Sequence, residues 1–351
     1  MKRSTFVQVF LFLFPGAVYA GGFDGLAIGV QPIFESGNYI ELTHHWLRPN
    51  IEGTDSAGND TGNLVRRLDS TSGAFKFDVS DSFSLALLTD EPYARSPYYR
   101  KGPAEGLKAS YKSRDWTLVG RYKLTPELSV YGGPFSQTLE IAAHQPQQLA
   151  GVAYTLKTDG DTRYGYTLGV AYEPMPFTRV SLTYRSKVQH KVEGTENGMD
   201  STIRQRTPES LTLDAQIPIS QSTLLFGSVF WAKWTGVSLA PPLFTATFGM
   251  PVKVFENDTI RYTLGAGYRI NETATLIGAF IYEKEKEEFS PLAPTSGIKA
   301  LSVGLKYDVG HGFNVTPMVT YSKFGDMSSP VFGEYRDNTM TIYSLKTSYN
   351  F

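Results

Sequence analysis

The chain has 351 residues, a formal net charge of −1 and no cysteine. A nearly neutral chain lacks the excess of Lys and Arg that is typical of nucleic-acid-binding proteins, and without cysteine it can form no disulfide bond. Aromatic residues make up 13% of the sequence although the mean hydropathy is only −0.22. Strands with alternating apolar and polar side chains produce this combination, so the low hydropathy does not exclude a membrane location.

The N-terminus has the pattern of a secretory signal peptide. Lys2 and Arg3 precede an apolar run over residues 6–14, and Val18-Tyr19-Ala20 forms a small-x-small cleavage site. The apolar run is too short to cross a membrane as a helix. We predict a signal peptide over residues 1–20 and a short segment over residues 21–37, which would act as a reduced plug if it folds inward.

Residues 38–351 are predicted to form one transmembrane domain, an all-β, antiparallel, up-and-down barrel of about 14 strands. Apolar and polar side chains alternate with period two in the predicted strands, as at Leu211, Leu213, Ala215 and Ile217 against Thr212, Asp214 and Gln216. The predicted strands cover residues 38–52, 64–78, 82–92, 106–123, 126–142, 152–174, 178–194, 205–217, 222–236, 258–270, 273–287, 296–309, 312–325 and 336–351.

The predicted connections alternate between two sizes. Short turns are expected near residues 79–81, 125–126, 174–176, 218–221, 270–272 and 310–312, and longer loops near 53–63, 93–105, 143–151, 195–204, 237–257, 288–295 and 326–335. Outer-membrane barrels have short periplasmic turns and longer outside loops. A soluble β-sandwich also alternates along its strands, but it has no reason to keep this order of connections.

The last strand supports the same interpretation. Tyr343, Leu345, Tyr349 and Phe351 share one face, whereas Ser344, Lys346, Ser348 and Asn350 share the other. In a barrel the apolar face meets lipid and the polar face meets a wet lumen. A strand that closes the chain on an aromatic residue is the usual ending of bacterial outer-membrane barrels, and we expect Phe351 to be read by the barrel-assembly machinery.

Three segments resemble the FadL type of outer-membrane transporters of long-chain fatty acids and hydrocarbons. They are Arg179-Val180-Ser181-Leu182-Thr183-Tyr184-Arg185-Ser186-Lys187, Thr207-Pro208-Glu209-Ser210-Leu211-Thr212-Leu213 and the strand from Leu225 to Trp234. The resemblance covers roughly residues 38–351 in strand order. It implies a monomeric 14-stranded barrel with an N-terminal plug, an outside capture groove, a lumenal site and a sideways exit at a kinked third strand. The chain departs from the family in its short N-terminal segment, which lacks the family's Asn-Pro-Ala element.

The best candidate for capturing a hydrophobic ligand is the long loop over residues 237–257. It carries Leu239, Leu243, Phe244, Phe248 and Met250, which is unusual apolar content for an exposed loop, and exposed apolar patches often mark binding sites. The alternative is that these side chains fold back onto the barrel rim. The candidate exit is Pro92, because proline lacks the N–H that a strand ladder needs; an ordinary strand end is the alternative.

A ligand carboxylate would need a fixed cation in the lumen. The cations expected on polar strand faces are Arg185, Lys187, Arg206, Arg261, Arg269, Lys306 and Lys346. Arg185 and Arg261 are the candidate ligand contacts; pairing with lumenal acids such as Glu173, Asp214, Glu283 and Asp308 is the alternative for any of them.

No constellation of residues indicates catalysis, so we expect no enzyme activity, no cofactor and no metal site. His44 and His45 are adjacent and would point to opposite faces of a strand, and no spacing singles out a nucleophile for a Ser-His-Asp hydrolase. The expected partners are a hydrophobic small molecule, outer-membrane lipid and lipopolysaccharide, with no nucleic acid.

The sequence therefore predicts passive uptake of long-chain fatty acids or other hydrophobic molecules through a bacterial outer-membrane barrel. Two alternatives remain open at this point. One is a general porin for small polar solutes, and the other is a structural or adhesive surface barrel without transport.

Overall fold

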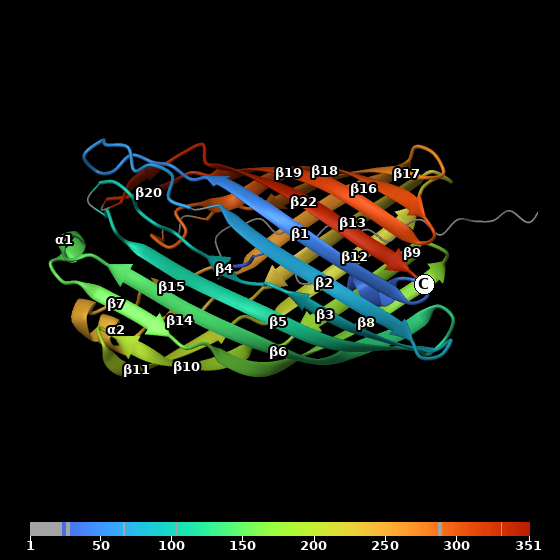
Figure 1. The fold of residues 1–351 in the computed structure, drawn as a ribbon, viewed down its shortest axis with the longest axis horizontal. Helices are drawn as coiled ribbons and strands as arrows, with labels where there is room; N and C mark the ends of the chain where they lie inside the picture. Colours follow the sequence, from blue (N-terminus) through green and yellow to red (C-terminus); the bar gives the residue numbers. More distant parts are fainter. Residues whose placement is uncertain (1–22, 26–28, 66, 103, 287–289, 331) are drawn as a thin grey trace, which may run out of the picture.

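The computed structural model describes residues 23–25, 29–65, 67–102, 104–286, 290–330 and 332–351. The predicted signal peptide lies outside these described residues. Almost every strand belongs to one antiparallel sheet that closes on itself as a barrel (Figure 1). The predicted all-β fold of 14 transmembrane strands is confirmed.

The barrel strands follow one another around the ring in chain order. In the described residues they are β1 (Tyr39–Asn50), β2 (Leu68–Asp78), β3 (Phe83–Asp90) with β4 (Ala94–Arg95), β5 (Lys108–Lys123), β6 (Leu128–Gln145), β7 (Tyr154–Thr158) with β8 (Asp161–Met175), β9 (Thr178–Arg185) with β10 (Val188–Glu196), β11 (Met199–Thr207) with β12 (Ser210–Pro218), β13 (Thr223–Ala232), β16 (Thr259–Arg269), β17 (Ala274–Glu283), β18 (Ser296–Gly310), β19 (Phe313–Gly325) and β22 (Thr339–Asn350). The ring closes where β1 pairs with β22 along its whole length, from Tyr39 opposite Asn350 to Asn50 opposite Thr339.

The remaining elements are not strands of the barrel wall. A 3₁₀ helix, η1 (Gln31–Phe34), precedes β1, and the longer loops contain α1 (Gln147–Ala150), α2 (Pro242–Phe248) and two small hairpins. The hairpins pair β14 (Ser238–Leu239) with β15 (Lys253–Val254), and β20 (Met327–Ser329) with β21 (Gly333–Tyr335). Among the described residues, no helix is long and apolar enough to cross a bilayer.

The two ends of the barrel differ as the sequence predicts. The C-terminus lies at the end where the tight turns join the strands, and α1, α2 and the longer loops lie at the opposite end (Figure 1). The backbone N–H of Phe351 donates a 3.0 Å hydrogen bond to the carbonyl of Asn38, which fixes the chain's last residue beside the start of β1. Short turns place this end in the periplasm.

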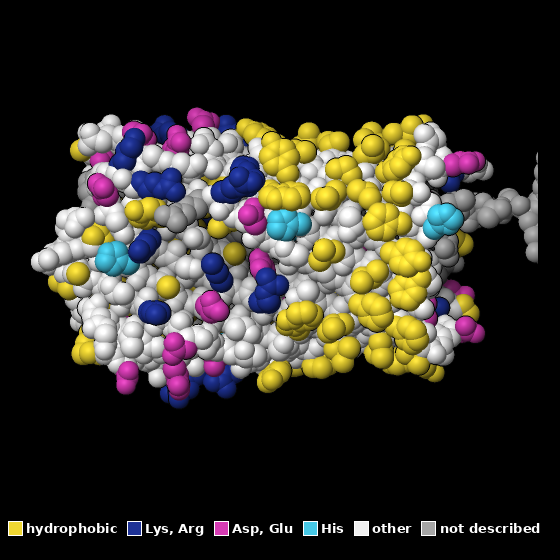
Figure 2. All heavy atoms as spheres, in the orientation of Figure 1, with side chains coloured by type: hydrophobic (Ala, Val, Ile, Leu, Met, Phe, Trp, Pro, Cys, Tyr) yellow, Lys and Arg dark blue, Asp and Glu magenta, His cyan; other side chains and the backbone are white. Residues whose placement is uncertain are grey.

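On the face drawn in Figure 2, a band of apolar side chains covers the periplasmic half of the barrel and charged side chains gather over the outer half. Leu168, Leu182 and Leu264 are examples of the exposed aliphatic side chains of the barrel wall. Exposed tyrosines stand at both edges of the band, as at Tyr166 with Tyr172 and Tyr262 with Tyr268. These are the aromatic girdles expected at the two membrane–water interfaces.

Two neighbouring barrel strands are interrupted for two residues at the same level. Residues 186–187 separate β9 from β10, and residues 208–209 separate β11 from β12; the register is the same on both sides, with Arg185 opposite Ser210 and Val188 opposite Thr207. The inward-facing parity changes at this interruption, because Ser181 and Arg185 are buried before it and Val188 and His190 after it, whereas Lys187 is exposed. The expectation that Lys187 shares the lumenal face of Arg185 is therefore wrong. Arg206 likewise lies on the face opposite to the buried Gln205 and Thr207.

Candidate functional site

A cavity of about 150 Å³ lies within the barrel, between β1, β2 and β3 on one wall and β12, β13 and β16 on another. The N-terminal segment forms part of its lining through Asp24, Gly25 and residues 29–32. The described part of this segment therefore lies inside the lumen, between the barrel walls. The space left there is small compared with the open channel of a porin.

The η1 helix anchors this segment to the inner wall near the periplasmic end. Ile33 is fully buried, and the ring of Phe34 lies 4.6 Å from the guanidinium of Arg121 and 4.1 Å from that of Arg179. Gln31 donates a 2.7 Å hydrogen bond to Asp214 and accepts one of 2.5 Å from Arg179. Stacking on two cations and two charge-assisted hydrogen bonds hold η1 across the lumen.

At the outer end of the cavity, Phe23 and Asp24 join the N-terminal segment to the long loop after β13. The ring of Phe23 packs on Tyr111 at 4.8 Å and on Phe255 at 5.0 Å between ring centroids. The Oδ2 atom of Asp24 accepts 2.8 Å hydrogen bonds from the indole N–H of Trp234 and from the hydroxyl of Thr259. Both residues are buried.

The third barrel strand is interrupted beside this point. Its ladder runs through β3 to Asp90 and resumes at Ala94 in β4, and Pro92 lies between the two pieces and lines the cavity. The N-terminal segment occupies the inner side of the interruption, since Gly25 donates a 2.6 Å hydrogen bond to the carbonyl of Pro92. The predicted break in the ladder is thus present, and it faces the lumen.

An apolar cluster fills the outer half of the lumen next to this interruption. Its buried members include Phe23, Tyr93, Tyr111, Trp234, Val237, Leu239 and Phe255, with inward-facing residues of β6, β7, β10 and β11. Phe244 and Phe248 of α2 pack on the cluster and remain partly exposed. A continuous set of apolar side chains therefore joins the outer surface to the lumenal cavity.

The structure places the five loop candidates at different depths. Leu239 is buried in the cluster, Leu243 is half-buried on α2, and Met250 is exposed at the tip of the loop. Phe244 and Phe248 stack at 4.5 Å, and Phe244 packs edge-on against Tyr154 at 5.0 Å. The loop thus combines both alternatives drawn from the sequence, because its inner residues pack on the barrel and its outer residues stay accessible.

Glu196, at the end of β10, fixes the position of α2. Its carboxylate accepts the backbone N–H groups of Leu243 at 3.2 Å and Phe244 at 3.0 Å, and the hydroxyl of Tyr154 at 2.7 Å. These N–H groups have no partner within the helix, so an acceptor at the helix N-terminus is stabilising. Outward residues of β10 such as Lys191 and Glu193 are charged, which places this region beyond the apolar band.

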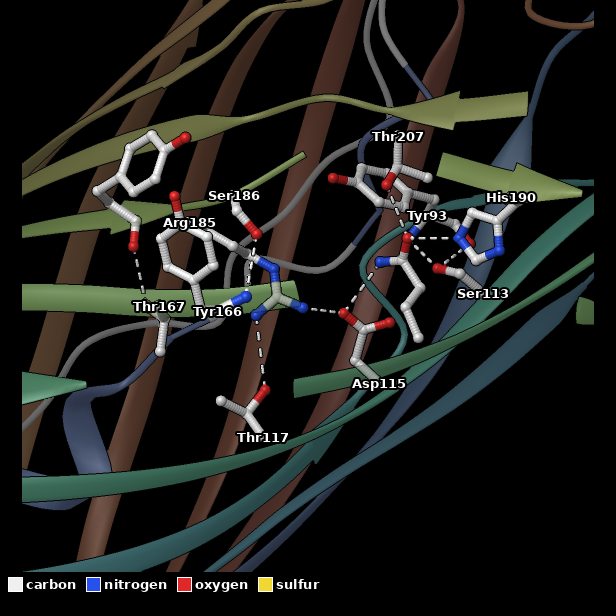
Figure 3. Close-up of polar contacts among 12 residues, drawn as sticks. Tyr93, Ser113, Asp115, Thr117, Tyr166, Thr167, Arg185, Ser186, His190 and Thr207 are labelled. Atoms are coloured by element: carbon white, nitrogen blue, oxygen red, sulfur yellow. Dashed lines mark hydrogen bonds and ion pairs between the residues drawn. The ribbon is translucent and has the colours of Figure 1, made fainter. Parts of the chain in front are cut away.

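The two candidate cations are both paired with acids. Arg185 forms a buried ion pair with Asp115, stacks 3.4 Å from the ring of Phe135 and extends a polar network through Gln137 to His190 (Figure 3). Arg261 pairs with Glu283 at 3.3 Å. Arg261 lines the cavity, whereas Arg185 is not among its described lining residues.

The sequence predicts the N-terminal segment as a possible plug, but not which of its residues contact the barrel. Gln31, Phe34 and Asp24 precede the first strand and share no periodic pattern. The signal was indirect, since apolar residues such as Ile33 and Phe34 before a barrel need a buried location. Glu196 was missed because capping residues are recognisable only when the helix they cap is known.

Comparison with known proteins gives one family. Residues 57–329 match the model of the outer membrane protein transport family (OMPP1/FadL/TodX). The chain belongs to this family. It is located in the bacterial outer membrane, as the sequence predicts, and the resemblance to FadL-type transporters is confirmed.

Individual relatives are distant. A putative outer membrane protein of Neisseria meningitidis serogroup B, NMB0088, is 24% identical over 233 residues, which cover 54% of this chain and 50% of that protein. The match thus spans about half the length of that curated relative.

Solved structures share the fold over nearly the whole chain. A FadL homologue of Pseudomonas aeruginosa superposes with a TM-score of 0.73 at 14% identity and 92% coverage of both chains. The toluene transporter TodX of P. putida gives a TM-score of 0.70 at 12% identity, covering 90% of this chain and 91% of TodX. The monoaromatic hydrocarbon channel CymD gives 0.62 at 15% identity and 94% coverage of both.

Proposed function

We propose that this barrel is a passive channel for uptake of hydrophobic small molecules, fatty acids or hydrocarbons, across the outer membrane. The observation that carries the proposal is the apolar cluster that runs from the partly exposed α2 to the interrupted third strand. Membership of an outer-membrane transport family and the named transport roles of TodX and CymD support the same conclusion.

The capture site in this proposal is the outer surface of the loop over residues 237–257. Phe248 and Met250 are accessible to a ligand, and Phe244 and Leu239 continue the apolar surface inward. Each apolar contact that leaves water contributes about 25 cal/mol per Å². A hydrophobic molecule would therefore bind first at α2 and then move along the cluster.

The exit in this proposal is lateral, at Pro92. A ligand in the cavity touches Pro92 and Tyr93, which lie in the interruption of the third barrel strand between β3 and β4. A ladder break lets a ligand leave through the wall into the membrane without crossing water. Because a hydrophobic ligand has a lower free energy in lipid than in water, it moves from the lumen through the barrel wall into the membrane.

The general-porin alternative is disfavoured by the N-terminal segment. Phe34 and Gln31 hold η1 across the lumen, and the cavity of about 150 Å³ is lined on one side by residues of this segment. A lumen occupied in this way cannot provide a wide water-filled path. We therefore infer that residues 29–37 act as a reduced plug. Because the matched family consists of transport proteins, we also propose that the protein has no catalytic activity.

The surrounding membrane supplies the other partners in our proposal. Arg48 follows Trp46 on the outward face of β1, and an open surface cleft brings it together with Arg67 and Arg100. Arginines just beyond an aromatic girdle suit the phosphates of lipopolysaccharide in the outer leaflet. We also infer a monomer whose C-terminal Phe351, exposed beside Tyr349, is recognised by the barrel-assembly machinery.

Uptake measurements test the proposed function. A strain lacking this gene is compared with the same strain expressing wild-type protein or the double variant Phe244→Asp, Phe248→Asp, with radiolabelled oleate and toluene as probes. We expect wild-type protein to restore uptake. The double variant should restore little, because the two aromatic side chains at the edge of the apolar cluster are replaced by charged ones and no longer bind a hydrophobic molecule. Met175→Asp is a matched control, since Met175 is exposed near the opposite end of the barrel.

Liposome swelling with sugars separates the remaining classes. Swelling comparable to that of an open pore would establish the porin alternative. Unchanged hydrophobic uptake in the deletion strain, together with no swelling, would leave only a structural or adhesive role.

A further inference from the structure

The ionisable side chains that line the lumenal cavity are predominantly acidic. Among its described lining residues are five acids (Asp24, Glu35, Glu41, Asp90 and Asp214) and two bases (Arg261 and Lys346). Both bases already have acidic partners, because Arg261 pairs with Glu283 and Lys346 pairs with Glu41. A ligand carboxylate that enters this cavity lies among acidic side chains in a site of low dielectric constant, and the two bases there already have acidic partners, which is unfavourable.

Asp24 adds a specific hydrogen-bonding feature to this cavity. The side chain is buried, with 4% of its surface exposed, and its Oδ2 atom accepts hydrogen bonds from Trp234 and Thr259. The Oδ1 atom has no hydrogen-bond partner among the described residues, and Asp24 lines the cavity. A buried acceptor without a donor is costly, so a ligand that supplies an O–H or N–H group there is favoured.

The surroundings of Asp24 suit a compact apolar ligand. Tyr93, Phe230, Leu88 and Val30 line the same cavity, and the ring of Phe23 lies in the adjoining apolar cluster. A cavity of about 150 Å³ is the size that is known to accept one benzene-sized molecule. An extended long-chain acid would need the cavity to enlarge.

We propose that Asp24 makes the lumenal site selective for uncharged single-ring molecules whose polar group donates a hydrogen bond, such as phenols, and that the acidic lining disfavours carboxylates, so that oleate should pass more slowly than toluene. This inference rests on the proposed transport function and names its substrate class. The aromatic body occupies the space beside Tyr93 and Phe230, and the hydroxyl donates to Oδ1 of Asp24. A methyl group in place of the hydroxyl leaves that atom unsatisfied.

Three probes of nearly equal size test the selectivity: p-cresol, toluene and p-toluate. Binding to the purified mature protein in detergent is measured by calorimetry, and entry into proteoliposomes is measured with the same compounds. We expect the affinity order p-cresol, then toluene, then p-toluate. In Asp24→Asn the amide oxygen can keep the Trp234 and Thr259 hydrogen bonds, while an NH₂ group, which donates hydrogen bonds, replaces the acceptor atom Oδ1. The variant should bind p-cresol about tenfold more weakly, leave toluene unchanged and bind p-toluate more tightly.

Two further variants separate selectivity from folding. Asp214→Asn removes another cavity acid and should improve p-toluate binding while p-cresol keeps its advantage over toluene. Asp69→Asn makes the same change at an exposed position on β2 and should alter no affinity. The heat-dependent shift in gel mobility of a folded barrel confirms assembly of every variant.

Tighter binding of p-toluate than of p-cresol to wild-type protein, or an unchanged affinity of Asp24→Asn for p-cresol, overturns the selectivity while toluene entry still upholds transport. Failure of all three compounds to bind or enter overturns both the selectivity and the proposed transport function.

Discussion

The backbone N–H of Gly25 donates a 2.6 Å hydrogen bond to the carbonyl of Pro92. This bond places the N-terminal segment against the inner side of the interruption in the third barrel strand. The neighbouring residues extend the contact, since Asp24 and Tyr93 form an antiparallel bridge. The segment therefore covers the gap through which we propose that ligands leave.

Gly25→Ala should open that gap. A Cβ atom at residue 25 would lie 2.9 Å from the carbonyl oxygen of Glu91 and 3.1 Å from that of Pro92, so the segment must shift. We expect a severalfold faster release of toluene from the channel into proteoliposome membranes. Gly29→Ala is the matched control on the same segment, because its Cβ would meet only atoms of Gln31 at 4.0 Å. Equal rates for the two variants would show that the segment does not control the exit.

Phe34→Ala should make the barrel leak ions. The variant removes the ring held between Arg121 and Arg179 and the edge contact with Tyr131 at 5.3 Å, and loss of a buried Phe side chain costs about 3–5 kcal/mol. Single-channel conductance in planar bilayers should rise. Phe75→Ala, a lipid-facing change on β2, should not alter conductance. A closed Phe34→Ala channel would mean that η1 is not the barrier.

The helix α2 should detach from Glu196 of β10 at acid pH. Burial of Glu196 opposes its charged form, but hydrogen bonds from Ser201, Tyr154 and the backbone of Leu243 and Phe244 outweigh burial and hold the pKa below its usual 4.5. The lowered pKa means that the stabilisation is fully present above pH 4.5 and is lost as the pH falls below it.

Amide hydrogen exchange at Leu243 and Phe244, corrected for its intrinsic pH dependence, checks this expectation. Protection in wild-type protein should be constant near neutral pH and fall in acid. Glu196→Gln should show lower, pH-independent protection, equivalent to about 1 kcal/mol or more. A Glu196→Gln profile that still falls in acid would assign the effect to another group.

Breaking the buried pair of Arg185 and Asp115 should destabilise the barrel wall. Arg185→Met leaves the carboxylate of Asp115 buried, with Gln137 as its remaining hydrogen-bond donor among the described residues, and such an uncompensated charge costs about 3–5 kcal/mol. The double variant with Asp115→Leu removes both charges and should recover most of this loss. Urea unfolding in detergent or lipid measures the difference. Equal stability of the single and double variants would contradict a buried ion pair.

The period-two alternation was sufficient to predict the barrel. Tyr262, Leu264 and Tyr268 face lipid as their spacing requires, and all fourteen barrel strands overlap the predicted ranges. The alternation fails at Lys187, because residues 186–187 lie outside the strand ladder and the inward-facing parity changes between β9 and β10. The matching interruption at Pro208 was visible as a proline within a strand, but residues 186–187 carry no such marker.

The candidate site was only partly predictable. The apolar content of the loop over residues 237–257 indicated Phe244 and Phe248, which do lie at the edge of the apolar cluster. Asp24 and Trp234 come together only when the barrel folds, because 210 positions separate them. Pairing of Arg185 with Asp115 likewise joins β9 to β5 across the lumen side of β6 and β8, and it depends on an inward orientation that sequence spacing alone does not determine.

The seam between β1 and β22 has a consequence for biogenesis. Tyr39 cannot find its partner Asn350 until the final strand has left the ribosome and crossed the inner membrane. Such distant pairing makes ring formation slow, so the exported polypeptide crosses the periplasm with its lipid-facing apolar side chains exposed to water. We therefore expect a periplasmic chaperone to bind the unfolded chain until the first and last strands pair.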